Sequence, residues 1–184
     1  PSPVAEQEAY PTSAAQERIW AHEQFDEQRN IYNVPAAFRL IGDLDAAALA
    51  GAFDELVERH ESLRTSFIRR AGALDQLVSD TVRLEIFRRD FAGKERGEEL
   101  AQLFIRADAS APFDLSRAPL LRVALLTMGP REHVLVVTLH HIVSDGWSLD
   151  VLQRELSALY AARRRGAPPR LPALPYQYKD FAAW

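Results

Sequence analysis

VLVVTLHH, at residues 134–141, is the stretch that decides the fold, since it is apolar on both faces before it ends in two histidines. A strand of that kind lies inside a sheet and is covered on both sides. Residues 120–127 form a second apolar run, and Met128, Gly129, Pro130 and Arg131 separate the two runs. We therefore expect a hairpin whose second strand, residues 133–139, is central.

Working outward, the sequence predicts helices and strands in a mixed order. Ser13 is placed to cap a helix over residues 13–24, with Gln16 or Glu17 reaching back to it. Asp45 is placed to cap a second helix that ends near Glu61. The other expected helices cover residues 94–109, the leucine-rich segment after the histidines (Leu149, Leu152, Leu156, Leu159) and residues 176–184, and the other strands cover 34–41, 65–69, 76–79 and 83–88. This mixture predicts an α/β fold, a sandwich of a mixed β-sheet flanked by helices.

Composition narrows the class of protein. The chain has 184 residues, 47% of them hydrophobic, which suits one domain or one lobe of a larger one. The net charge is −4, and the sequence contains no basic stripe. Nucleic acid is therefore not an expected partner. No apolar run approaches the ~18 residues of a membrane span. The lack of cysteine agrees with a cytoplasmic location. Residues 1–9 are interpreted as a linker and residues 10–184 as the folded unit.

The histidine run His140–Asp145 is the candidate site, and the residues alone leave three interpretations open. Neighbouring strand residues face opposite sides, so one histidine is expected to be structural while the other faces a cleft. The pair can therefore be a polar turn or a catalytic element. A metal site would need further ligands, and the remaining histidines (His22, His60, His133) lack the spacing to supply them. A nucleophile at Ser144 lacks the Gly-x-Ser-x-Gly elbow. No metal is expected.

Four blocks, in order along the chain, carry a family resemblance. They are SAAQERIW at 13–20, RHESLRTSF at 59–67, HHIVSDGWS at 140–148 and YKDFAAW at 178–184. With these blocks the chain resembles the condensation domain of nonribosomal peptide synthetases. The resemblance implies a chloramphenicol-acetyltransferase-like fold in which two lobes face each other across a tunnel. The sequence ends at the fourth block, so it matches the N-terminal lobe alone.

The resemblance implies an amide-forming acyltransferase. The full domain would join a donor thioester to an acceptor amine, each tethered by phosphopantetheine to a donor or acceptor peptidyl carrier protein. No cofactor is expected in the chain itself. The partners would be the two carriers, the second lobe and the adjoining synthetase domains. The first block is similar to the subtype that joins an L-donor to an L-acceptor, and the isolated fragment is expected to be inactive.

Residue roles follow from the same resemblance. His141 is the expected catalytic histidine, acting mainly by positioning the amine, and backbone N–H groups from Gly146 onward would help to stabilise the oxyanion. His140 is expected to be a packed, hydrogen-bonded residue. Asp145 is expected to pair with Arg64 and to hold the loop. The tunnel and motif residues would be Gln16, Arg18, Trp20, Trp147 and Ser148.

Two rival functions remain at this point. An epimerisation domain of the same superfamily shares the histidine motif but not the 13–20 block. A non-catalytic module that binds carrier proteins would need no active histidine, and the intact His141 argues against that function for the parent protein. Joining the lobe to its missing half would discriminate between these functions.

Overall fold

The computed structural model describes residues 2–25 and 29–184. Its centre is a four-stranded sheet formed by β2 (Asn33–Ile41), β5 (Ile86–Asp90), β6 (Leu121–Gly129) and β7 (Glu132–His140). The strand order is β2-β7-β6-β5, and only the β5–β6 pair is parallel. The predicted hairpin is therefore confirmed, and β7 is an interior strand.

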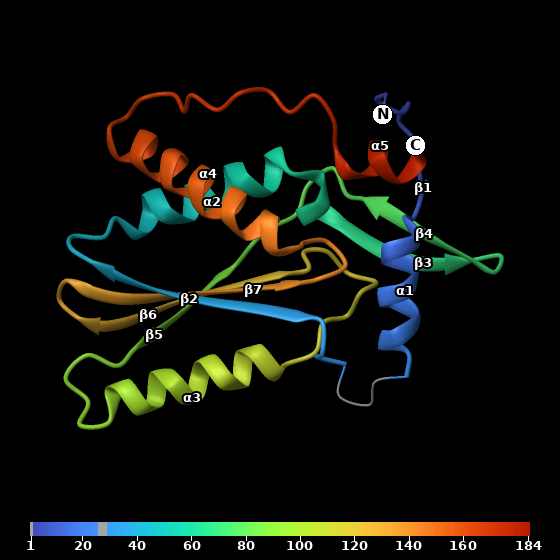
Figure 1. Ribbon diagram of the computed structural model, residues 1–184. Coiled ribbons are helices and arrows are strands. Elements are labelled where there is room, and N and C mark those ends of the chain that lie inside the picture. The colour runs from blue at the N-terminus through green and yellow to red at the C-terminus, as the bar shows by residue number, and fades with distance from the viewer. Residues whose placement is uncertain (1, 26–28) are drawn as a thin grey trace.

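Helices cover both faces of this sheet, which explains why residues 134–137 of β7 are apolar on both faces (Figure 1). Helices α2 (Ala46–Arg59) and α4 (Gly146–Arg164) lie side by side on one face, and α3 (Gly97–Ser110) lies on the other. Val137 faces α2 and α4, whereas Val136 faces α3, and both are almost completely buried. The two faces of β7 thus serve two separate core clusters.

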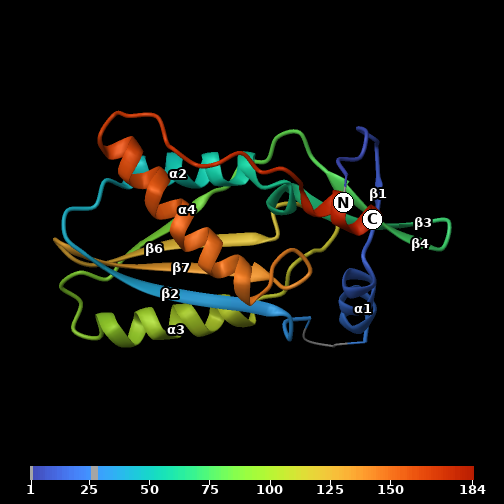
Figure 2. The same cartoon turned by 45° about the horizontal axis from the view of Figure 1, so that its top comes forward.

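A second, smaller sheet lies beyond the end of β7, and the sequence did not predict it (Figure 2). Its order is β1-β4-β3, with β1 at Tyr10–Pro11, β3 at Thr65–Arg70 and β4 at Ala73–Val78. The predicted mixed sheet flanked by helices is the main sheet, and the strands expected at 65–69 and 76–79 belong to this additional sheet. Strand β4 pairs with β3 on one side and with β1 on the other, so both of its edges are occupied.

Three short helices complete the fold around the smaller sheet. Helix α1 (Ala14–Glu23) begins at an N-cap, Ser13, in the capping box with Gln16 that the sequence predicts. The 3-10 helix η1 (Glu61–Arg64) joins α2 to β3, and α5 (Tyr178–Ala183) ends the chain. Both chain ends lie beside α5 (Figure 1).

The segment interpreted as a linker, residues 1–9, contacts the fold over the part that is described. The Val4 backbone N–H donates to Asp180 Oδ1 over 2.8 Å, and the Gln7 N–H donates to the Tyr10 hydroxyl over 3.0 Å. Pro1 lies outside the described residues. Among residues 2–25 and 29–184, no helix has both the length and the apolar character needed to cross a membrane.

Candidate active site

The two adjacent histidines at the end of β7 occupy opposite environments. His140, the last residue of the strand, is fully buried, whereas His141 begins the turn and is exposed. The backbone N–H of His140 donates to Leu120 O over 3.1 Å, and that of His141 donates to Tyr32 O over 2.8 Å. The backbone therefore holds both residues while their side chains face different surroundings.

His140 has a hydrogen bond at each ring nitrogen. The Ile142 backbone N–H donates to Nδ1 over 3.2 Å, so Nδ1 carries no proton. The proton therefore lies on Nε2, which donates to Glu23 Oε1 over 2.9 Å. Burial is the main cause that lowers the pKa of His140 below its ordinary value, against the opposing effect of Glu23. His140 is thus a neutral imidazole with a defined tautomer.

Aromatic rings and the turn itself enclose His140. The ring of Phe113 meets the imidazole edge to face, with 5.8 Å between centroids, and Tyr32 lies 6.2 Å away on a tilted plane. The carbonyl of His140 accepts from the Val143 N–H over 3.1 Å and from Ser144 Oγ over 3.0 Å. Ser144 is therefore a turn residue that donates its hydroxyl proton to the backbone.

His141 presents its imidazole to solvent. The ring meets the Tyr32 ring edge to face at 6.4 Å. Within the described part of the chain, neither ring nitrogen has a hydrogen-bond partner. An imidazole that is held by its backbone and free at both nitrogens can exchange a proton with, or hydrogen-bond, a group that approaches from outside.

Asp145 and Ser148 cap the N-terminus of α4. Asp145 Oδ1 accepts from the Ser148 N–H over 2.8 Å and from Ser148 Oγ over 2.6 Å, while the Asp145 N–H donates to Ser148 Oγ over 3.1 Å. The Ser148 side-chain bond is the first cause that lowers the pKa of Asp145, and the nearby charge of His141 adds to it. The cap uses the third N–H of the helix, so those of Gly146 and Trp147 remain without an intrahelical acceptor.

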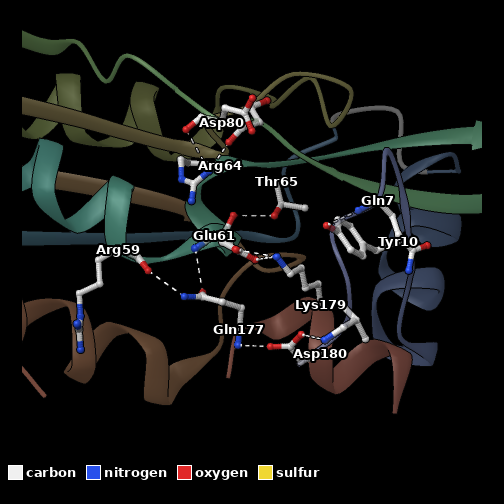
Figure 3. Close-up of polar contacts among 12 residues, drawn as sticks. Gln7, Tyr10, Arg59, Glu61, Arg64, Thr65, Asp80, Gln177, Lys179 and Asp180 are labelled. Carbon is white, nitrogen blue, oxygen red and sulfur yellow. Dashed lines mark hydrogen bonds and ion pairs between the residues drawn. The ribbon is translucent and has the colours of Figure 1, made fainter. Parts of the chain in front are cut away.

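The predicted ion pair between Asp145 and Arg64 is wrong in this structure. Arg64 donates from Nε to Val57 O over 3.1 Å, and it also donates to the carbonyls of Glu58 and Ser79. A further bond runs from Arg64 to Asp80 O (Figure 3). These bonds join the end of α2 to the segment after β4. A guanidinium has several N–H donors in a fixed plane, and here carbonyls at a helix end satisfy them.

The residues of the first sequence block lie at different depths. Gln16 is buried, and its Nε2–H donates to Ile142 O over 3.4 Å, so it contacts the histidine loop directly. Trp20 is half-buried beneath the guanidinium of Arg69, 5.7 Å from the ring centroid. Arg18 is exposed. Only Gln16 of this block is hydrogen-bonded to the loop.

Gly146 and Trp147 form an open surface at the start of α4. Gly146 lacks the positive φ that a tight return would require, and an added Cβ there would meet nothing within 4 Å. The chain turns at residues 141–143, before the helix starts at Gly146. Trp147 is 74% exposed. It also borders a small cavity of about 130 Å³ behind the loop, whose lining does not include His141.

Sequence reasoning missed Glu23 and Tyr32, the two residues that touch the histidines most closely. Glu23 is 2% exposed and lies two helical turns after Gln16, on the same face of α1. That spacing was the available signal for Glu23. For the hydrogen bond from His141 to Tyr32 there was no signal, because its acceptor is a backbone carbonyl, which every residue has. Within the described residues, no group of three His, Asp or Glu side chains is placed to hold a metal ion.

A second polar cluster joins α2 and α4 away from His141. Glu155 Oε2 lies 3.0 Å from Arg59 Nε and 2.7 Å from His60 Nε2. Burial would raise the pKa of Glu155, but the hydrogen bonds from His60 and Arg59 outweigh it and leave that pKa lowered. This cluster lies against the core between the two helices.

Helix α5 is attached through the segment that follows α2 (Figure 3). Gln177 accepts from the Glu61 N–H over 3.1 Å and donates to Arg59 O over 3.0 Å. Lys179 Nζ lies 2.7 Å from the Glu61 carboxylate, and this contact raises the pKa of Lys179 although burial acts in the opposite direction. The second and fourth sequence blocks are therefore in direct contact.

Comparisons with known proteins agree with this geometry. The family model described as "Condensation domain" matches residues 6–184. The chain is 43% identical to tyrocidine synthase 3 of Brevibacillus parabrevis, over 99% of this chain and 3% of that protein. It is 40% identical to a chondramide synthase of Chondromyces crocatus, over 100% of this chain and 5% of that protein. The chain therefore spans only a small part of these relatives.

Solved structures show the same fold. The X-domain, in a complex of that domain with OxyB from teicoplanin biosynthesis, is 35% identical, with a TM-score of 0.86 over all of this chain and 39% of the solved one. The first condensation domain of the CDA synthetase is 25% identical, with a TM-score of 0.86 over 97% of this chain and 46% of the solved one. The predicted α/β fold class is confirmed.

Proposed function

This chain belongs to the condensation-domain family, and from that membership we propose that it is the N-terminal lobe of a domain that joins two carrier-bound substrates by an amide bond. The observation that carries the proposal is His141. Its imidazole is exposed, it has no hydrogen bond within the described residues, and the backbone bond to Tyr32 holds it at the end of a buried strand.

The proposed reaction is acyl transfer from a thioester to an amine. The acceptor nitrogen attacks the donor carbonyl carbon, a C–N bond forms, and a tetrahedral oxyanion results. The oxyanion collapses as the C–S bond breaks, and the sulfur leaves on the phosphopantetheine arm of the donor carrier. The proton lost by the nitrogen passes to His141 and then to the departing thiolate, so atoms and charges balance.

Positioning is the main contribution that we assign to His141. An α-amino group has an unperturbed pKa of about 8, so a useful fraction is already neutral near pH 7. A strong base is therefore less necessary than it is for a hydroxyl nucleophile. Holding two reactants in line can supply about 7–11 kcal/mol of the barrier. A hydrogen bond from the exposed imidazole to the amine or to the tetrahedral intermediate would contribute part of this.

The start of α4 is the proposed source of oxyanion stabilisation. Asp145 takes the N–H of Ser148, so the first two N–H groups of the helix, those of Gly146 and Trp147, are available to an approaching oxygen. The positive end of the helix dipole lies at the same place. Backbone donors of this kind are preorganised and can favour a developing negative charge.

We also propose that the second lobe supplies the other wall of the site. His141 lies on the surface, and the small cavity behind the loop does not reach it. A water-exposed imidazole gains little from the low dielectric that strengthens electrostatic catalysis. The isolated lobe is accordingly expected to be inactive. The block around Gln16, Arg18 and Trp20 supports an L-donor and L-acceptor subtype.

The test uses the complete domain together with loaded donor and acceptor carriers. Wild-type protein is expected to form the dipeptidyl thioester, and His141→Ala to lower its rate by about 10²- to 10⁴-fold. His133→Gln is the matched control, because His133 lies at the opposite end of β7. An undiminished rate in His141→Ala would remove that residue from the mechanism.

A second candidate function is a protein-binding module without catalysis. The observation in its favour is the 35% identical X-domain, whose structure is that of a complex with another protein, OxyB. Under this candidate the complete wild-type domain binds a protein partner but forms no dipeptidyl thioester. The assay above therefore separates the two functions.

A further inference from the structure

Helix α1 directs two buried polar side chains at the histidine loop. Gln16 and Glu23 are each 2% exposed and lie two turns apart on one face of the helix. Gln16 donates to Ile142 O over 3.4 Å, and Glu23 accepts from His140 Nε2 over 2.9 Å. The helix therefore contacts the loop at two consecutive points.

The Glu23 contact is a costly one for the fold to maintain. A carboxyl group removed from water needs a compensating partner. Within the described residues, Glu23 has no Lys or Arg at ion-pair distance, and its partner is the neutral ring of His140. An apolar pair of similar size would serve packing alone at lower cost. The buried contact between Glu23 and His140 is therefore interpreted as a means of positioning the histidine loop.

We propose that Glu23 is a positioning residue that acts through His140 to hold the turn on which His141 stands. By accepting a hydrogen bond from Nε2–H, Glu23 favours the tautomer in which Nδ1 of His140 carries no proton. Nδ1 then accepts the Ile142 N–H over 3.2 Å, which holds the backbone next to His141 in place. This inference rests on the proposed function for its consequence, but the contacts themselves do not depend on it.

Loss of the Glu23 acceptor would affect the turn through the tautomer. Without it, only the Ile142 N–H still favours the Nε2–H form, and in that form the buried Nε2–H has no acceptor, so the Nδ1–H form becomes competitive. In the Nδ1–H form, two N–H donors face each other at Ile142, and the turn must shift to separate them. A displacement of about 1 Å in a reacting group can cost about 10²-fold in rate. His141 is the next residue in the chain and would move with the turn.

Three variants of the complete domain test the kinetic consequence. Glu23→Leu removes the acceptor, Glu23→Gln keeps an amide oxygen at the same place, and Glu17→Leu is the control on an exposed site of the same helix. Glu23→Leu is expected to lower kcat by up to about 10²-fold, the cost of a displacement of about 1 Å in a reacting group, with KM for the acceptor carrier unchanged. Glu23→Gln should recover most of kcat, and Glu17→Leu should match wild type.

The results separate this inference from the proposed function. If wild-type protein forms product and His141→Ala does not, but Glu23→Leu keeps the wild-type kcat, the role of Glu23 is refuted alone. A raised KM with unchanged kcat also refutes it, since that result would assign Glu23 to binding. If wild-type protein forms no product at all, the proposed function has failed instead.

Nitrogen-15 NMR of the histidine side chains provides a measurement that is independent of catalysis and of how Glu23→Leu folds. Wild-type protein is expected to show His140 as the Nε2–H tautomer near pH 7, and Glu23→Gln to show the same form. An Nδ1–H tautomer or a charged ring in wild-type protein would overturn the inference.

Discussion

Two histidine–carboxylate contacts in this lobe have similar distances but differ in whether a cation is present. His140 and Glu23 lie 2.9 Å apart beside the turn, and His60 and Glu155 lie 2.7 Å apart between α2 and α4. The first contact contains a neutral imidazole and no cation. The second includes the guanidinium of Arg59 at 3.0 Å from Glu155. The difference lies in the additional partner of each pair.

That additional partner determines what each pair can do. A backbone N–H at Nδ1 of His140 selects one tautomer and connects the pair to the turn. A guanidinium on Glu155 stabilises the carboxylate and connects the pair to the end of α2. The first pair therefore orients a loop, whereas the second holds two helices together. Distance between a histidine and a carboxylate alone would not distinguish these roles.

Glu155→Leu is expected to have the largest effect on stability. It leaves the guanidinium of Arg59, with 18% of its side chain exposed, without its carboxylate. Removing one partner of a buried ion pair costs about 3–5 kcal/mol, and the partial exposure of Arg59 favours the low end of that range. The free energy of unfolding of the complete domain, measured in urea, checks the value.

Glu23→Leu provides the matched comparison for that measurement. It leaves a neutral N–H unpaired, which costs about 1–3 kcal/mol. The contrast between the two pairs predicts that Glu155→Leu destabilises more than Glu23→Leu. A reversed order would show that the two pairs do not differ in the way described.

Acidification is expected to weaken the fold through His140. Burial lowers the pKa of His140 from its ordinary 6.5, so below pH 6.5 the unfolded chain binds a proton that the folded chain does not. The free energy of unfolding therefore falls as the pH drops below 6.5, by at most about 1.4 kcal/mol per pH unit for one proton. Unfolding in urea between pH 7.5 and 5.5 measures this slope.

The double variant Glu23→Leu with His140→Phe is the control for that titration. It removes both polar partners together and so leaves neither one unpaired. Its slope over the same pH range is expected to be shallower than that of wild type. Equal slopes would mean that His140 does not cause the acid sensitivity.

Asp145→Ala is expected to have the smallest effect on stability. Asp145 is an exposed cap of α4 and makes no ion pair with Arg64, so its loss costs about 1 kcal/mol. Ser148→Ala removes the other half of the same capping box and should cost a similar amount. A loss of unfolding free energy as large as that of Glu155→Leu would show that Asp145 does more than cap the helix.

Local patterns were enough to predict most of the secondary structure. Two apolar runs separated by a turn predicted β7 and its hairpin partner, and the caps Ser13 and Asp45 predicted two helix starts. The division into two sheets was not predictable in this way. Strand pairing depends on contacts between distant residues, and a short strand such as β4 has the same local pattern in either sheet.

The candidate site was predicted in part. Strand alternation indicated that His140 and His141 would face different surroundings, because side chains of neighbouring strand residues point to opposite faces. The partner of Asp145 was predicted wrongly. The family resemblance implied an ion pair with Arg64, but a helix cap close in sequence satisfied Asp145, and backbone carbonyls satisfied Arg64.

The sequence by itself determined the elements, the buried strand and the histidine run at its end, because these follow from local periodicity and from caps a few residues away. Only the tertiary structure decided that Glu23 meets His140, that Tyr32 holds His141, and that Arg64 lies apart from Asp145. The physical reason is that the partner of a buried polar group is whichever donor or acceptor the packed elements bring within about 3 Å. That choice depends on how distant segments pack and has no local signature in the chain.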